Sequence, residues 1–125
     1  LYPMLDDRTV VGYHPGHRLW NADSNRFGWR AYLGDADPAI AVPARREDLA
    51  GLPPAWIGVG TLDLFHDEDL AYAERLKAAG VPCHLEVAPG AFHGFDMLAP
   101  KAGVSQAFFN SQCASLREAL TRAAT

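Results

Sequence analysis

An unbroken apolar run from residue 55 to residue 60 is the feature that most restricts the fold of this chain. The run reads Ala-Trp-Ile-Gly-Val-Gly, and its length suits a strand better than a helix. A strand without alternating polar residues is typical of a parallel sheet that is covered on both faces. The run therefore predicts an α/β fold in which further strands and helices surround this segment.

Residues 67 to 87 carry the pattern of a helix followed by a second strand. Three consecutive acidic residues, 67 to 69, would lie at the positive end of the helix dipole, and Gly80 would end the helix. Residues 83 to 87 alternate as a strand does, and Pro89-Gly90 then turns the chain. The order strand, helix, strand predicts two parallel strands joined by a crossover helix.

The remaining segments predict one more strand and further helices. The short apolar segment 2 to 5 suits a buried strand that runs into a polar loop. Ser24 is expected to cap a helix over residues 25 to 33 that a glycine ends. A short helical turn is expected near residues 46 to 49, and a final helix over residues 105 to 122.

About three parallel strands with flanking helices would leave sheet edges and apolar faces uncovered. The chain also begins at Leu1, not at Met, and its first residues are apolar. We therefore expect residues 1 to 125 to form one partial domain that is incomplete as a domain. Such a chain would associate with itself or pair with a missing N-terminal portion. The alternative, an interaction domain complete in itself, requires a closed core within these residues.

Composition and charge exclude several classes of partner. The chain is 49% hydrophobic and 21% charged, as in an ordinary globular domain. Its net charge is −4 with both signs interspersed, so no basic stripe indicates a nucleic-acid partner. No apolar run reaches the roughly 18 to 20 residues that span a bilayer.

Cysteine and histidine spacing predict neither a zinc site nor a secreted disulfide scaffold. Cys83 and Cys113 match no metal-binding spacing, which favours a reducing, cytoplasmic location, although a disulfide between them stays open. The histidines at 14 and 17 and the cluster at 66 to 69 contain residue types that bind metals. A Pro-Gly turn and a helix N-terminus explain these two segments more simply, and we expect no metal.

Asp63 and His93 each follow shortly after a predicted parallel strand. The working residues of α/β sheets project from loops at the carboxyl ends of the strands. A histidine that passes a proton from a nucleophile to a leaving group needs a carboxylate on its other ring nitrogen. Position alone leaves open a simpler interpretation, in which Asp63 caps a turn and His93 fills a loop.

Three separated motifs resemble the hormone-sensitive-lipase-like branch of the α/β-hydrolases. They are Tyr-Pro-Met-Leu-Asp-Asp-Arg at residues 2 to 8, Gly-Thr-Leu-Asp-Leu-Phe-His-Asp-Glu at 60 to 68, and Pro-Gly-Ala-Phe-His-Gly-Phe at 89 to 95. The resemblance spans nearly the whole chain and implies the C-terminal part of an α/β-hydrolase fold. It implies that Asp63 is the acid and His93 the base of a catalytic triad that hydrolyses small acyl esters without a cofactor. Many members have Pro-Leu-Arg where this chain has Leu-Phe-His after the acid, a departure that leaves the acid itself unchanged.

The chain lacks two motifs that precede the acid and the base in this fold. Neither a Gly-x-Ser-x-Gly nucleophile elbow nor a His-Gly-Gly oxyanion segment occurs in the 125 residues. None of its serines has the pair of flanking glycines of an elbow, and they are expected to be helix caps or surface residues: Ser24, Ser105, Ser111 and Ser115. We therefore expect an upstream nucleophile and an inactive isolated chain. The alternative is a non-catalytic α/β-hydrolase-like binding protein without any nucleophile.

The residues beside the acid and the base have supporting roles in this interpretation. Asp67 and Glu68 belong to the resembling motif and are expected to hold the loop that carries the acid, through hydrogen bonds to backbone N–H groups. Phe65 and Phe92 would either line a substrate pocket or pack in the core, and the sequence leaves both possibilities open. Trp20 is expected to contribute to packing alone.

Overall fold

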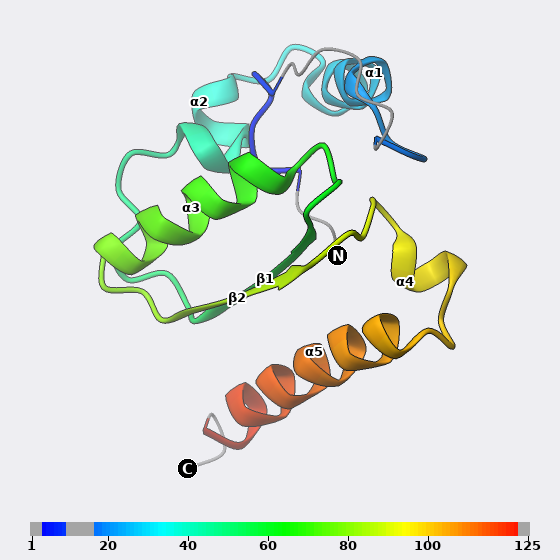
Figure 1. The fold of residues 1–125 in the computed structure, drawn as a ribbon. Coiled ribbons are helices and arrows are strands. Elements are labelled where there is room, and N and C mark those ends of the chain that lie inside the picture. The colour runs from blue at the N-terminus through cyan, green and yellow to red at the C-terminus, as the bar shows by residue number, and fades with distance from the viewer. Residues whose placement is uncertain (1–3, 10–16, 123–125) are drawn as a thin grey trace.

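The structure is a computed structural model that describes residues 4 to 9 and 17 to 122. The elements are, in chain order, α1 (Ala22–Leu33), α2 (Pro38–Ala41), the 3-10 helix η1 (Pro43–Arg45), β1 (Ala55–Gly60), α3 (His66–Ala78), β2 (Cys83–Ala88), α4 (Phe95–Leu98) and α5 (Gly103–Arg122). Strands β1 and β2 are parallel neighbours, with Ala55 opposite Cys83 and Gly60 opposite Ala88. Helix α3 lies on one side of this pair and α5 on the other (Figure 1). The predicted α/β class is confirmed.

The described part of the chain contains two strands where about three are expected. Residues 2 and 3 of the expected first strand lie outside the described residues, and Met4 and Leu5 belong to no strand. The physical reason is a competing acceptor, because the backbone N–H groups of Leu5 and Asp6 donate to the Glu68 carboxylate at 2.7 and 3.2 Å. A side chain thus takes the hydrogen bonds that a neighbouring strand would make.

Two local predictions in the first half of the chain are wrong. Helix α1 begins at Ala22, and its cap is Asn21, whose Oδ1 accepts hydrogen bonds from the N–H groups of Asp23 and Ser24 at 3.0 Å each. Ser24 therefore lies inside the first turn and is not the cap. Residues 46 to 49 form no helical turn, since the two short helices α2 and η1 precede them. Both of these helices start with a proline, whose missing N–H is harmless at the first helical position.

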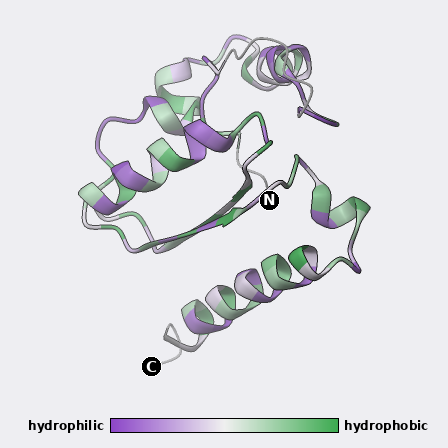
Figure 2. Ribbon diagram, in the orientation of Figure 1, coloured by the Kyte–Doolittle hydropathy of each residue, from purple (hydrophilic) through white to green (hydrophobic). Residues whose placement is uncertain are grey.

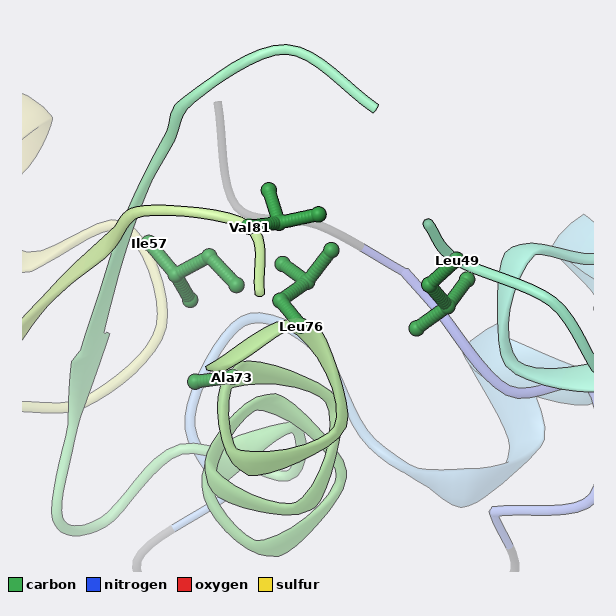
Figure 3. Close-up of a cluster of buried hydrophobic side chains, with 5 residues drawn as sticks. All are labelled: Leu49, Ile57, Ala73, Leu76 and Val81. Carbon is green, nitrogen blue, oxygen red and sulfur yellow. The ribbon is translucent and has the colours of Figure 1, made fainter. Parts of the chain in front are cut away.

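One hydrophobic cluster packs β1 against α3. Its buried side chains are Leu49, Ile57, Ala73, Leu76 and Val81. Figure 3 shows Ala73 and Leu76 on α3 facing Ile57 of the strand and Val81 of the following loop. Burying side chains of this size favours folding by about 1.5 to 3 kcal/mol for each large residue. This cluster fixes the helix that directly follows the Asp63 loop.

A second hydrophobic cluster packs the opposite face of the sheet against α4 and α5. It contains Ala88, Ala91, Phe95 and Phe108, with the partly buried Trp56 beside them. Neighbouring strand residues point to opposite faces, so Trp56 and Ile57 serve different clusters. The ring of Trp56 meets that of Phe108 edge to face, with centroids 5.1 Å apart. This cluster fixes the segment that directly follows the His93 loop.

Helix α5 leaves apolar side chains in solvent. Figure 2 shows hydrophobic and hydrophilic residues mixed along this helix. Its exposed large apolar residues are Val104, Phe109, Leu116 and Leu120.

Over residues 4 to 9 and 17 to 122, no helix has both the length and the apolar character that crossing a membrane requires. Cys83 and Cys113 are both free thiols.

Candidate active site

Asp63 lies in the turn that follows the carboxyl end of β1. Its own N–H donates to the Gly60 carbonyl at 3.1 Å, which folds the turn back onto the strand. Its Oδ1 accepts a hydrogen bond from the Phe65 N–H at 3.1 Å. The side chain is 1% exposed. The chain thus buries a carboxylate at the strand end and leaves its second oxygen, Oδ2, directed to another partner.

Three hydrogen bonds join the Asp63 turn to the loop after β2. The N–H of Thr61 donates to the Ala88 carbonyl at 3.1 Å, and the N–H of Leu62 donates to the Ala91 carbonyl at 2.9 Å. The Gly90 N–H donates back to the Thr61 hydroxyl at 2.8 Å. The two loops therefore behave as one unit, and residues that follow them are positioned relative to each other.

His93 extends from the second of these loops toward Asp63. Its Nδ1 lies 3.1 Å from Asp63 Oδ2, and its side chain is 16% exposed. The Phe65 ring packs edge to face against the imidazole, with ring centroids 5.4 Å apart. Sequence reasoning places the two residues in neighbouring loops, and the structure brings their side chains within hydrogen-bonding distance.

The Asp63–His93 pair has the chemistry of a proton-transfer device. A carboxylate that accepts from Nδ1–H fixes the histidine tautomer in which Nε2 is the basic nitrogen. The same carboxylate stabilises the positive charge that appears when Nε2 takes up a proton. Burial strengthens this interaction because less water screens it.

Glu68 and Asp67 do not hold the Asp63 loop, which corrects the expectation from sequence. Glu68 accepts hydrogen bonds from the N–H groups of Leu5 and Asp6 and from the Thr9 hydroxyl. Burial raises the pKa of Glu68, and these hydrogen bonds oppose the shift. The Asp67 side chain is 97% exposed and pairs with its neighbour His66 at 2.8 Å. Glu68 therefore holds the segment 5 to 9 against α3, a contact between residues more than 50 positions apart in the sequence.

The two phenylalanines beside the acid and the base have different surroundings. Phe65 is 1% exposed and belongs to the packing around His93, so it is a core residue. Phe92 is partly buried, and the Arg18 guanidinium lies 5.9 Å above its ring. Of the two roles that the sequence leaves open, pocket lining and core packing, Phe65 thus has the second.

Two residues that sequence reasoning did not connect with the site lie next to it. The Trp20 ring packs against the His93 ring with centroids 6.0 Å apart. Asp69 is wholly buried, and neither carboxylate oxygen has a hydrogen-bond partner. Burial, followed by the charges of Glu68 and Asp63, raises the pKa of Asp69 to about 9. No sequence signal separates Asp69 from its neighbours, because an acidic run at a helix start is commonplace.

Other polar groups in the described part of the chain lie elsewhere. The Ser111 hydroxyl on α5 accepts from the Trp56 indole at 3.1 Å and donates to Glu86 at 3.0 Å. His84 forms a histidine–carboxylate pair with Glu86 at 3.3 Å, as His66 does with Asp67, but the side chains of His84 and Glu86 are substantially exposed. The described residues hold no group of three or more histidine, cysteine or acidic side chains able to bind a metal.

An open cavity of about 430 Å³ beside α1 is lined by Asp7, Arg26, Trp29, Arg30, Leu33 and Gly34, away from the Asp63–His93 pair.

Comparison with known proteins places these features in a family. The sequence profile of a family described as the alpha/beta hydrolase fold matches residues 1 to 97. The carboxylic ester hydrolase LipN of Mycobacterium tuberculosis is 35% identical over 98% of this chain, which covers 34% of LipN. The crystal structure of esterase LipW from Mycobacterium marinum superposes with a TM-score of 0.83 at 38% identity, over 95% of this chain and 39% of LipW. A bacterial heroin esterase superposes with a TM-score of 0.81 at 34% identity, over 95% of this chain and 41% of that protein.

The chain thus spans about a third of the length of LipN and about two fifths of these two structures. Its fold is a part of the α/β-hydrolase fold, with two parallel strands and flanking helices in the described residues, and it corresponds to the C-terminal part of homologous chains. On the profile match and the identity with LipN, the chain belongs to the hormone-sensitive-lipase-like esterase family of α/β-hydrolases.

Proposed function

We propose that this chain supplies the acid Asp63 and the base His93 of a Ser-His-Asp triad that hydrolyses carboxylic esters. The nucleophilic serine and the oxyanion hole belong to a part of the fold outside residues 1 to 125. The substrate is a small acyl ester, and the reaction needs no cofactor. A cytoplasmic location stays a prediction, and the free thiols of Cys83 and Cys113 are compatible with it.

One observation carries the proposal more than any other. The Nδ1 of His93 lies 3.1 Å from Oδ2 of a carboxylate that is 1% exposed, at the carboxyl ends of two parallel strands. A purely structural ion pair does not require this orientation, in which Nδ1 and not Nε2 meets the carboxylate. The Ser-His-Asp triad uses this orientation, because the carboxylate on Nδ1–H makes Nε2 the basic nitrogen. The esterase relatives support the same chemistry.

The proposed reaction proceeds by two acyl transfers. The serine hydroxyl attacks the acyl carbon while His93 Nε2 takes its proton, and the imidazolium then returns that proton to the leaving alcohol oxygen. In the second transfer His93 takes a proton from water, which attacks the acyl-serine, and the imidazolium returns that proton to the serine oxygen as its bond to the acyl carbon breaks and the acid leaves. Throughout, Asp63 holds the Nδ1–H and stabilises the imidazolium.

The test uses the intact protein, meaning residues 1 to 125 together with the rest of the fold. We expect His93→Ala to abolish hydrolysis of p-nitrophenyl acetate, and Asp63→Asn to lower kcat by up to about four orders of magnitude because the wrong tautomer results. The matched control is His84→Ala, which removes the exposed histidine of the His84–Glu86 pair and should leave kcat within about twofold.

Folding of each variant is checked by its thermal unfolding midpoint. Rates near wild type in a folded His93→Ala protein would show that the chemistry lies elsewhere. Ester binding without turnover in the unaltered intact protein would instead favour the non-catalytic binding function.

A further inference from the structure

The segment from Arg18 to Trp20 makes an unusual turn directly beside the proposed base. Leu19 has a φ of 67°, and it is the only residue other than glycine with a positive φ among the described residues. The Trp20 N–H donates to the Arg18 carbonyl at 2.8 Å, across a single residue. A hydrogen bond of this kind around a central residue of positive φ is a γ-turn of the rare, strained form. Strain is retained in folded proteins mainly where surrounding structure and function require it.

The turn is held in place by contacts on both of its sides. The Trp20 ring packs against His93 and also lies on α1, where a methyl group added at Gly28 would be 3.3 Å from the indole. The Arg18 guanidinium lies over the Phe92 ring. Both neighbours of Leu19 are therefore anchored, one on each side of the residue that carries the strain.

The Leu19 side chain is exposed at the His93 loop instead of being buried. It is 59% exposed, and a methyl group added at Gly94 would lie 3.1 Å from its Cδ1. The same added methyl group would lie 3.4 Å from Cε of Met97, which is 70% exposed. Two apolar side chains, one from the γ-turn and one from α4, thus both lie beside Gly94, the residue next to the base.

We propose that Leu19, together with Met97, is a specificity-determining residue that contacts the alcohol part of an apolar ester. The inference rests on the proposed function and deepens it. During acylation the base must lie within hydrogen-bonding reach of the leaving alcohol oxygen, because it delivers the proton there. The alcohol group therefore passes the loop of His93, and apolar side chains that border this loop favour an apolar alcohol.

The test varies the alcohol of the ester while the acyl group stays the same. In the intact protein, kcat/KM is measured for methyl, butyl and hexyl acetate with wild type, Leu19→Gly, Leu19→Asn and Met97→Ala. Glycine and asparagine both tolerate a positive φ, so the turn can form without the apolar side chain. We expect each variant to lower the hexyl-to-methyl ratio of kcat/KM by about fivefold, mainly through KM. Leu98→Ala, a 61% exposed leucine on the same short helix as Met97, is the matched control and should leave the ratio unchanged.

A second series uses methyl esters of acetic, butyric and hexanoic acid. It tests whether Leu19 and Met97 contact the alcohol part of the ester and not the acyl part. The inference would be overturned if the hexyl-to-methyl ratio of kcat/KM is unchanged in both folded Leu19 variants. It would also be overturned if kcat/KM changes only in the acyl series. These outcomes are distinct from failure of the proposed function. If folded His93→Ala is still active, the esterase assignment itself fails, whereas an inactive His93→Ala with unaltered Leu19 variants rejects only the role of Leu19.

Discussion

The Gly60 Cα lies directly against the backbone of Ala91. A Cβ atom added at Gly60 would be 2.1 Å from the Ala91 carbonyl oxygen and 2.6 Å from the carbonyl carbon, far inside van der Waals contact. Gly60 ends β1 three residues before Asp63, and Ala91 precedes His93 by two. The absence of a side chain at this position therefore lets the two loops of the proposed site approach each other.

Gly60→Ala should separate these loops and so weaken the Asp63–His93 pair. We expect the intact protein to lose about 2 kcal/mol or more of stability, because backbone atoms cannot move aside as a flexible side chain can. A displacement of about 1 Å at the site can lower activity about a hundredfold. Thermal unfolding and ester hydrolysis measure the two effects. Gly103→Ala, where nothing lies within 4 Å of the added Cβ, is the control, and equal behaviour of the two variants would contradict the prediction.

Asp69 should make stability decrease as the pH rises. Its pKa is about 9 in the folded protein and about 3.9 in an unfolded chain, so the unfolded chain loses its proton first. The neutral acid therefore contributes fully to the free energy of unfolding below about pH 4. This contribution is lost between about pH 4 and pH 9, by up to about 1.4 kcal/mol per pH unit.

Replacing Asp69 by leucine removes the titrating group and keeps the site apolar. We expect a flatter dependence of the unfolding free energy on pH between 5 and 9, measured by urea unfolding at each pH. Asp67→Asn is the control, because the Asp67 side chain is 97% exposed and should not alter the slope. If the unfolding free energy of Asp69→Leu depends on pH as steeply as that of wild type, the Asp69 carboxyl is not the source of the pH dependence.

Glu68→Ala should release the segment 5 to 9 from α3. The substitution leaves the N–H groups of Leu5 and Asp6 without their acceptor, a loss of about 1 to 3 kcal/mol for a partly buried pair. Glu68→Gln should retain most of the stability, since its amide oxygen can accept both hydrogen bonds. Thermal unfolding compares these variants with Glu74→Ala, whose side chain is 71% exposed. Equal destabilisation by Ala and Gln would indicate that the charge, and not the hydrogen bonds, matters.

Residues 1 to 125 on their own should be catalytically silent and prone to associate. In the described residues the sheet has two strands, and α5 exposes Phe109, Leu116 and Leu120. Exposed strand edges and apolar patches favour self-association. Light scattering, thermal unfolding and an ester assay of the purified chain provide the measurements. A cooperative monomeric unfolding transition would contradict the structural part, and hydrolysis blocked by a serine-directed inhibitor would contradict an external nucleophile.

The sequence by itself determines the elements that carry the proposed acid and base. The apolar run at β1, the helical period of α3 and the alternation of β2 are local signals, and each predicts its element within a few residues. The positions of Asp63 and His93 follow because the carboxyl ends of parallel neighbours meet at one edge. The family resemblance adds their roles, which stay a proposal.

The tertiary structure alone decides which distant groups meet around the pair. Glu68 binds the backbone of Leu5, 63 residues away, and Trp20 packs on His93 across an even longer separation. Asp69 is buried without a hydrogen-bond partner, while Asp67, two residues earlier, is exposed. Such contacts depend on how α1, α3 and the loops pack in space, and a pattern read over a short window does not contain this information. The strained turn at Leu19 has the same origin, because anchors on both sides impose a conformation that leucine does not favour.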